Sequence, residues 1–326
     1  MKVRLMFFVL LALALSGLSA VQAAPSKPVI GISVPNTGEK YYALLVKAAR
    51  TRAQAAGVDV VFVDAEDDLE KEVANVKSLV DQKVDAILYL PLDFTESAAA
   101  LDPARKANIP VLLLDANFNI DPADKTITPL VKADNLQAGM LAAKTLCTKL
   151  SGKKATILDL APFPETAQSG ESLGTIQARA RQAAVRNYVK KSCPLLTLKS
   201  MSLEGTDRDA MRNTLRDQLK AEPASAVVTY NGPSVSTLIE AATLARVPAP
   251  VVVSFDVTGN ILSAIRSGRV LATVGVDPEI LGRSAIDTTK IYIRNKSFSP
   301  VLIKPALLDA ASIQGLDSRK CPGGCP

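Results

Sequence analysis

The sequence of 326 residues contains no histidine. Histidine is the commonest general base near neutral pH and the commonest protein ligand for metals, so its absence excludes a Ser-His-Asp triad and histidine metal sites. The segment 170–174 (GESLG) has the G-x-S-x-G spacing of a hydrolase nucleophile elbow. That elbow requires a histidine downstream, so we interpret the segment as the start of a helix and predict no catalytic residue.

Other functional signatures are also absent. No G-x-G-x-x-G and no G-x-x-x-x-G-K-[ST] occurs, so nothing indicates nucleotide binding. The 38 basic residues are interleaved with 32 acidic ones rather than gathered in a block, which argues against nucleic acid as a partner. Four cysteines without histidine fall short of a metal site. We therefore predict no cofactor, no metal and no nucleic-acid partner.

The first 23 residues have the pattern of a secretory signal peptide. Lys2 and Arg4 precede an apolar run over 5–15, and Val21-Gln22-Ala23 places small side chains at the positions that a signal peptidase reads. The run is short for a membrane span, and no cysteine near Ala23 indicates lipidation. Cleavage after Ala23 leaves 303 residues with a formal net charge of +4. We therefore predict a free protein in the periplasm.

Export makes disulfide bonds permissible for the four cysteines. Cys147 lies on the apolar stripe of a predicted helix, and Cys193 follows the next predicted helix. A bridge between them closes a loop of about 46 residues and stabilises the fold by roughly 4 kcal/mol on the chain-entropy model. Cys321 and Cys325, in the sequence Cys-Pro-Gly-Gly-Cys, are predicted to form a second, small bridge in a tail.

Apolar runs alternate with amphipathic stretches along the mature sequence. Strands are predicted over 29–34, 58–63, 86–90, 111–114, 155–160, 195–198, 226–230, 251–255 and 270–276. Helices are predicted over 39–56, 68–82, 95–107, 134–150, 172–191, 208–221, 234–246, 259–267 and 279–294. The rhythm restarts halfway, which favours an α/β fold with two doubly wound parallel-sheet lobes. A single (β/α)₈ barrel is the alternative fold.

Polar side chains follow several of the predicted strands. Asn36, Asp115, Asn231 and Asp256 each come at or just after a strand end. Ligands of open α/β sheets bind beyond the carboxyl ends of the strands, so these residues are candidates for one binding cleft. Helix N-caps and Asx-turns favour the same residue types, and the pattern alone leaves that alternative open.

At these strand ends the chain resembles the periplasmic sugar-binding proteins of the ribose/galactose-binding type, which share their core with LacI-type repressors. The resemblance covers about Pro28 to Leu307. It is carried by Ile32 to Asn36, Tyr41-Tyr42, Glu72 to Val76, Leu88 to Asp93, Ala107 to Val111 running into Asp115, and Val252 to Asp256.

The resemblance implies a type I periplasmic binding protein with two lobes joined by three crossovers. It places lobe one at 24–132 plus 277–304, lobe two at 133–276 plus 305–316, and a Cys-containing tail at 317–326. The implied function is capture of a sugar or polyol by a monomer whose lobes close on it and which then docks on an ABC permease. A receptor that signals to a sensor protein is the first alternative, and a diverged enzyme is the second. The chain lacks the helix-turn-helix of a repressor.

The resemblance also implies the ligand contacts. Tyr41 and Tyr42 match the aromatic pair that stacks on the sugar, and Asp115, Asn231 and Asp256 match polar residues that bind its hydroxyl groups. The complete predicted ligand-binding set is Asn36, Tyr41, Tyr42, Asp115, Ala116, Thr175, Asn231, Asp256 and Val276.

Three members of this set depart from the family pattern. Ala116 and Thr175 stand where the family has arginine, and Val276 stands where it has glutamine. A second-lobe aromatic is replaced by Gly205-Thr206, and Phe118 or Phe163 is available to fill the vacated space. These changes predict a pocket without the two guanidinium groups and therefore a smaller polyol, a more apolar ligand or a modified sugar. The alternative is a protein that no longer binds a pentose or a hexose.

Overall fold

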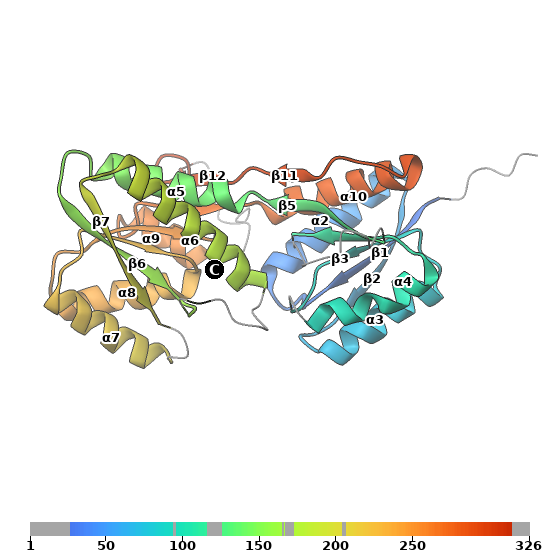
Figure 1. Cartoon of the computed structure of the whole chain (residues 1–326), viewed down its shortest axis with the longest axis horizontal. Coiled ribbons are helices and arrows are strands. Elements are labelled where there is room, and N and C mark those ends of the chain that lie inside the picture. The colour runs from blue at the N-terminus through green and yellow to red at the C-terminus, as the bar shows by residue number, and fades with distance from the viewer. Residues whose placement is uncertain are drawn as a thin grey trace, which may run out of the picture.

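The computed structural model describes residues 27–93, 96–115, 126–164, 166, 173–203 and 207–314. Two α/β lobes lie side by side along the long axis of the molecule (Figure 1). Each lobe is built on one six-stranded sheet within the described residues. This finding rules out the alternative of a single barrel and confirms two parallel-sheet lobes.

The sheet of lobe one has the strand order β11-β5-β4-β3-β1-β2. Its strands are β1 (Val29–Val34), β2 (Asp59–Asp64), β3 (Ala86–Tyr89), β4 (Val111–Leu114), β5 (Ile127–Ala133) and β11 (Val301–Ile303). All their pairings are parallel. The helices are α2 (Lys40–Ala56), α3 (Leu69–Asp81), the 3₁₀ helix η1 (Glu96–Leu101), α4 (Asp102–Ala107) and α10 (Pro278–Asn295).

The sheet of lobe two has the order β12-β10-β9-β8-β6-β7. Its strands are β6 (Ala155–Ala161), β7 (Leu196–Ser202), β8 (Ala226–Thr229), β9 (Val251–Phe255), β10 (Ala272–Gly275) and β12 (Ala306–Asp309). The edge strand β12 runs antiparallel to β10, whereas the other pairings are parallel. The helices are α5 (Asn135–Lys149), α6 (Leu173–Ser192), α7 (Arg208–Ala221), α8 (Gly232–Ala245) and α9 (Gly259–Arg266).

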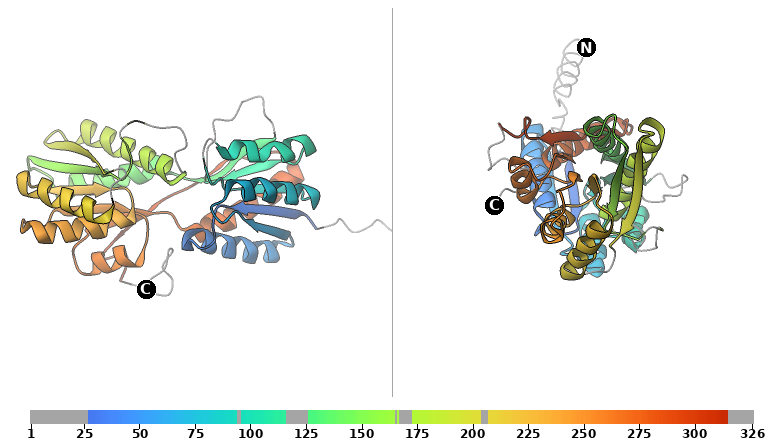
Figure 2. Two further views of the ribbon diagram at one scale, coloured as in Figure 1. Left: turned by 90° about the horizontal axis from the view of Figure 1, so that it is seen from below. Right: turned by 90° about the vertical axis from the view of Figure 1, so that its left-hand side faces the viewer.

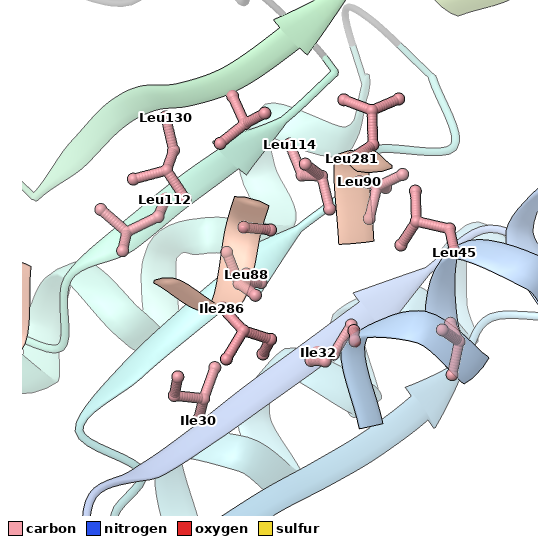
Figure 3. Close-up of a cluster of buried hydrophobic side chains, with 14 of the residues drawn as sticks. Ile30, Ile32, Leu45, Leu88, Leu90, Leu112, Leu114, Leu130, Leu281 and Ile286 are labelled. Carbon is pink, nitrogen blue, oxygen red and sulfur yellow. The ribbon is translucent and has the colours of Figure 1, made fainter. Parts of the chain in front are cut away.

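Each sheet carries helices on both faces, as the two additional views show (Figure 2). In lobe one, side chains of β1, β3 and β4 pack against α2 and α10 on one face, including Ile32, Leu45, Leu88 and Ile286 (Figure 3). The other face packs against α3, η1 and α4. Because both faces are buried, the strands read as continuous apolar runs rather than alternating ones.

The chain passes between the two sheets three times. It leaves lobe one after β5, returns after β10, and passes once more between β11 and β12. These passages place the amino termini of α5 and α10 between the lobes, where Asp134 and Asp277 cap them by accepting bonds from Gln137 N and Glu279 N. The three crossovers are as predicted, and the predicted lobe boundaries stay a prediction.

The helices α5 and α6 are joined at several points along one face. Asn135, Gly139 and Cys147 of α5 follow one another at multiples of four residues and so share one side of the helix. Asn135 Oδ1 accepts a bond from Arg181 Nε at 2.8 Å, and Cys147 forms a disulfide bond with Cys193, with 6.1 Å between the Cα atoms. The predicted bridge between Cys147 and Cys193 is confirmed, whereas Cys321 and Cys325 lie outside the described residues.

Two local expectations need correction. The helix predicted over 95–107 is the pair η1 and α4, and Pro103 lies in the first turn of α4. Proline cannot continue the preceding turn, because it lacks the amide hydrogen and its ring collides with the carbonyl four residues earlier. In addition, β5, β11 and β12 were not predicted.

Within the described part of the chain, no helix combines the length and apolar character that crossing a bilayer requires.

Candidate functional site

A cavity of about 450 Å³ lies between the two lobes. Its walls come from the helix starts and strand ends that face each other across the crossovers. The lining residues are Glu39, Lys40, Tyr41, Tyr42, Leu90, Asp115, Ala133, Gly174, Gln177, Arg181, Asp256, Val257, Thr258, Gly275, Val276 and Pro278. We call this the interlobe cavity. Its volume lies within the range of small-molecule sites.

The lobe-one wall is centred on Asp115, which follows β4. The Tyr41 hydroxyl donates a hydrogen bond to Asp115 Oδ2 at 2.8 Å, and the Ala133 amide donates one to Oδ1 at 2.8 Å. Asp115 is only 5% exposed, and burial raises the pKa of its carboxyl group above the ordinary value. Burial, followed by the nearby Asp115 charge, raises the pKa of Tyr41 well above its usual value, so Tyr41 remains a neutral donor.

Tyr42 stands beside Tyr41 in the same helix start. The two rings meet edge to face, with centroids 5.4 Å apart. Burial raises the pKa of the Tyr42 hydroxyl as well. Val276, which follows β10, lines the same cavity and packs against the lobe-one core. The lobe-one wall is therefore largely aromatic and apolar, with its one buried carboxylate covered by protein donors.

The lobe-two wall is centred on Arg181 of α6 and Asp256, which follows β9. Arg181 Nη1 lies 3.3 Å from Asp256 Oδ1, and the guanidinium carbon lies 5.3 Å from the centroid of the Phe255 ring. With Nε bonded to Asn135, the guanidinium group has a fixed orientation. The Asp256 side chain is 44% exposed, against 14% for Arg181. This wall therefore offers an accessible carboxylate next to an oriented cation.

Asp115 and Asp256 occupy equivalent places at strand ends in the two lobes, and both have left-handed backbone conformations. Their φ angles are 55° and 71°. Such values are uncommon for residues other than glycine, although aspartate and asparagine tolerate them better than most. The backbone at both strand ends is thus turned sharply where the cavity begins, as is often found at binding sites.

A second cavity of about 270 Å³ adjoins the first. It shares Gly174, Gln177, Arg181 and Asp256 with the interlobe cavity and is also lined by Pro162, Phe163, Thr175, Ala178, Tyr230 and Asn231. Tyr230 stacks on Phe255 with ring centroids 5.4 Å apart, and its hydroxyl donates to the buried Asp159 at 2.7 Å. This anchored aromatic pair forms a rigid floor beneath Arg181.

A side-chain hydrogen bond links the two walls directly. Gln177 of α6 donates from Nε2 to the backbone carbonyl oxygen of Asp115 at 2.8 Å. Gln177 and Arg181 are four residues apart, so they lie on the same face of α6. That face therefore both lines the interlobe cavity and makes a direct bond to lobe one.

The predicted site residues do not all meet. Tyr41, Tyr42, Asp115, Asp256 and Val276 line the interlobe cavity, while Thr175 and Asn231 line the second one. Asn231 also caps α8 by accepting a bond from Ser234 N at 3.0 Å, so the helix-cap interpretation is confirmed and its contact with a ligand stays a prediction. Ala116, Phe118 and Gly205-Thr206 lie outside the described residues.

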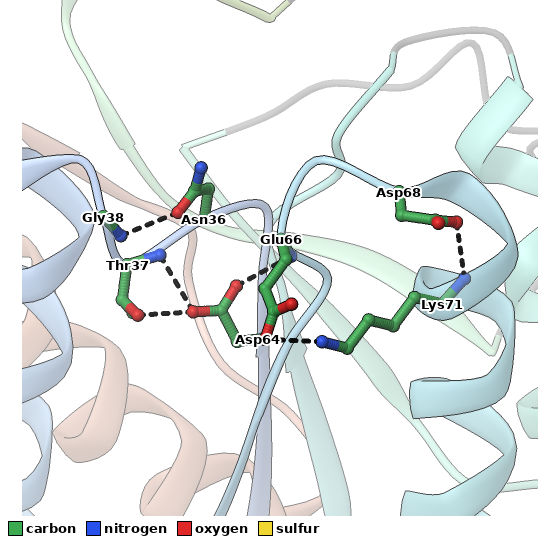
Figure 4. A network of polar contacts seen from close by, with 7 residues as sticks. All are labelled: Asn36, Thr37, Gly38, Asp64, Glu66, Asp68 and Lys71. Atoms are coloured by element: carbon green, nitrogen blue, oxygen red, sulfur yellow. Dashed lines mark hydrogen bonds and ion pairs between the residues drawn. The ribbon is translucent and has the colours of Figure 1, made fainter.

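Asn36 has a different place. It lines neither of these two cavities and instead holds the turn after β1, where its Oδ1 accepts a bond from Gly38 N at 2.7 Å (Figure 4). Its amide group also donates to Asp67. Next to it, Thr37 donates two bonds to Asp64. In this structure Asn36 therefore supports the loop before α2 rather than the cavity wall.

Arg181 and Gln177 were missed from the sequence. The two guanidinium groups expected by resemblance at positions 116 and 175 are absent from the sequence, but a third position, Arg181, brings a guanidinium group to both cavities. The available signal was spacing, since Gly174, Gln177 and Arg181 follow at i, i+3 and i+7 and so share one face of the predicted helix. Arg181 lines the second cavity together with Thr175, the position at which the family has an arginine, so a cation is present in that part of the site.

Comparison with known proteins agrees with this architecture. The family described as periplasmic binding protein domain matches residues 30–297. The ribose import binding protein RbsB of Bacillus subtilis (strain 168) is 26% identical over 281 residues, covering 86% of each chain. The galactofuranose-binding protein YtfQ of Escherichia coli (strain K12) is 25% identical over 287 residues, covering 84% of this chain and 86% of YtfQ.

Solved structures show the same fold. A periplasmic ribose ABC transporter structure from Conexibacter woesei superposes with a TM-score of 0.76 at 17% identity, covering 88% of this chain and 93% of that chain. A galactofuranose binding protein superposes with a TM-score of 0.67 at 25% identity, covering 87% and 95%. The fold is that of a type I periplasmic binding protein. The chain belongs to the periplasmic binding protein domain family.

Proposed function

We propose that this protein captures a sugar or polyol in the interlobe cavity and delivers it to the permease of an ABC importer. The observation that carries the proposal is the cavity itself, which both lobes line with aromatic rings, a carboxylate and a guanidinium group. Rings contact the C–H faces of a sugar, and charged groups make directional bonds to its hydroxyl groups. The function is binding, with no chemical change to the ligand.

The chemistry of the two walls assigns a role to each. Tyr41 and Tyr42 supply the apolar surface on lobe one, and Arg181 with Asp256 supplies a donor beside an acceptor on lobe two. Neighbouring hydroxyl groups of a polyol both donate and accept, so they fit such a pair. Named relatives that bind ribose or galactofuranose support this ligand class.

Lobe closure is part of the proposal. The hinge lies at the three crossovers, with boundaries at 132/133, 276/277 and 304/305. Closure excludes water from the cavity and strengthens the bonds of the charged groups to the ligand. The closed form is the one that the permease recognises. The amino-terminal signal pattern and the match to the periplasmic binding protein domain family support a periplasmic location.

The test is a thermal-shift screen of the mature protein against pentoses, hexoses and polyols, followed by calorimetric titration of each hit. A ligand that binds only the folded state raises the melting temperature by mass action. Asp256→Ala is the site variant, and we expect its Kd to rise at least ~10-fold, since a buried ligand hydroxyl loses its acceptor. Lys190→Ala, an exposed change near the far end of α6, is the control. The absence of any hit, or equal Kd values for Asp256→Ala and the wild type, contradicts the proposal.

A further inference from the structure

We infer that Tyr41 is a specificity-determining residue: its hydroxyl occupies Asp115 in place of a ligand hydroxyl, so the cavity selects a deoxy sugar or deoxy polyol. Such a ligand places a carbon without oxygen, or a methyl group, against the lobe-one wall, and its hydroxyl groups against lobe two. This inference rests on the proposed function and narrows its ligand class.

The first support is the state of the Asp115 carboxylate. Each of its two oxygens already accepts a protein hydrogen bond at 2.8 Å, one from Tyr41 and one from Ala133. The residue is 5% exposed, although it belongs to the cavity wall. Tyr41 presents the same chemical group as a sugar alcohol, so the protein itself supplies the hydroxyl for which a polyol would compete.

The second support is the contrast with the opposite wall. Asp256 is also a strand-end aspartate with a left-handed backbone, but its side chain is 44% exposed. Only its Oδ1 oxygen has a bond to Arg181 among the described contacts, and this bond is long at 3.3 Å. The two equivalent carboxylates are thus unequal: the one on lobe two faces the ligand, and the one on lobe one is covered.

The covered carboxylate weakens the binding of a ligand that points a hydroxyl group at lobe one. A carboxylate oxygen can accept a second bond, but Asp115 is only 5% exposed and its open side is taken by Tyr41. A ligand hydroxyl that points at lobe one therefore competes with Tyr41 for this acceptor or loses its own bond to water. A buried hydroxyl group without a partner costs about 1–3 kcal/mol. A deoxy carbon or methyl group at the same place contacts the Tyr41 and Tyr42 rings and incurs no such cost. The site therefore favours the deoxy member of a ligand pair.

The experiment compares matched ligands by calorimetric titration. The pairs are D-fucose with D-galactose, L-rhamnose with L-mannose, and 2-deoxy-D-ribose with D-ribose. For the wild type we expect at least one pair in which the deoxy member binds ~10-fold or more tightly. In Tyr41→Phe the ring stays and Asp115 is released, so the hydroxylated member should gain and the ratio should fall at least ~5-fold.

Tyr292→Phe is the matched control, because Tyr292 packs in lobe one against Phe298 and lies outside the cavity wall. Its ratio should equal that of the wild type. Circular dichroism of Tyr41→Phe checks its folding, and the wild-type ratios alone still test the inference if that variant is unstable. Tighter or equal binding of the hydroxylated member in every pair, or a ratio unchanged by Tyr41→Phe, overturns the inference while sugar capture stands. Failure of both proteins to bind any compound overturns sugar capture, and the inference falls with it.

Discussion

The contact between α5 and α6 at Gly139 gives a sharp test of how the lobe-two wall is held. A Cβ atom added at residue 139 would lie 2.3 Å from the carbonyl oxygen of Arg181 and 2.6 Å from Ala184 Cβ. Ordinary van der Waals contact begins near 3.4 Å, so the helices must separate by about 1 Å to admit a methyl group. The backbone that would be pushed is the one that carries the cavity arginine.

For Gly139→Ala we expect a net loss of about 1–2 kcal/mol in the free energy of unfolding. Overpacking costs about 1–3 kcal/mol, and the better helix propensity of alanine returns less than about 1 kcal/mol. The melting temperature should fall by several degrees, and the Kd of any ligand should rise, because Arg181 is displaced. Urea unfolding and titration measure the two effects.

The control for this prediction is Gly232→Ala. Gly232 opens α8, and a Cβ atom there would meet its nearest neighbours at 3.5 Å, which is an ordinary contact. We expect its stability to stay within about 0.5 kcal/mol of the wild type. If Gly139→Ala is as stable as the wild type, the close approach of the two helices is not the constraint described here.

Three further predictions concern the bridge, the link between the lobes and pH. Cys147→Ser with Cys193→Ser should lower the free energy of unfolding of the oxidised protein by up to ~4 kcal/mol for a separation of 46 residues, and an unchanged urea midpoint would contradict this. Gln177→Ala removes the hydrogen bond from α6 to the Asp115 carbonyl oxygen. We expect the radius of gyration of the ligand-free protein, measured by small-angle scattering, to increase and the Kd for ligand to rise about 2–10-fold. Unchanged values would show that this bond does not hold the two lobes together. The pKa of Asp115 is higher in the folded protein than in the unfolded chain. The contribution of Asp115 to the free energy of unfolding is therefore fully present below the unfolded-state pKa and is lost as the pH rises through the folded-state pKa. The melting temperature of Asp115→Asn relative to wild type should therefore increase from pH 3 to pH 7, and a flat difference would refute the burial argument.

Most of the fold was predictable because both faces of each sheet are buried, and strands in such sheets have continuous apolar sequences that are easily recognised. The strands β1, β3, β4, β8 and β9 are runs of apolar residues, and the intervening helices have the period expected of helices covering a sheet. The strands that were not predicted, β5, β11 and β12, have weaker apolar patterns. β5 contains Pro129, which is tolerated because β5 pairs with β11 only from Val131 onward, so Pro129 has no partner on that side.

The site was predictable only in part. Strand-end residues such as Asp115 and Asp256 could be found, because the carboxyl edge of a parallel sheet is where ligands bind. Spacing could put Arg181 on the same helix face as Gln177, but the direction of its guanidinium group depends on Asn135, a residue 46 positions away on another helix. Tyr41 covers the Asp115 carboxylate because the tertiary fold brings the two residues together. The local sequence around either residue does not indicate this contact.

The bridge between Cys147 and Cys193 has a meaning beyond stability. It joins the carboxyl-terminal ends of α5 and α6, and the same two helices also meet where Asn135 of α5 orients the cavity residue Arg181 of α6. Disulfide bonds form in the oxidising space outside the cytoplasm and not in the reducing cytosol. In a reducing compartment the chain would therefore lack this bridge, and the two helices that carry Asn135 and Arg181 would be joined only by their noncovalent contacts.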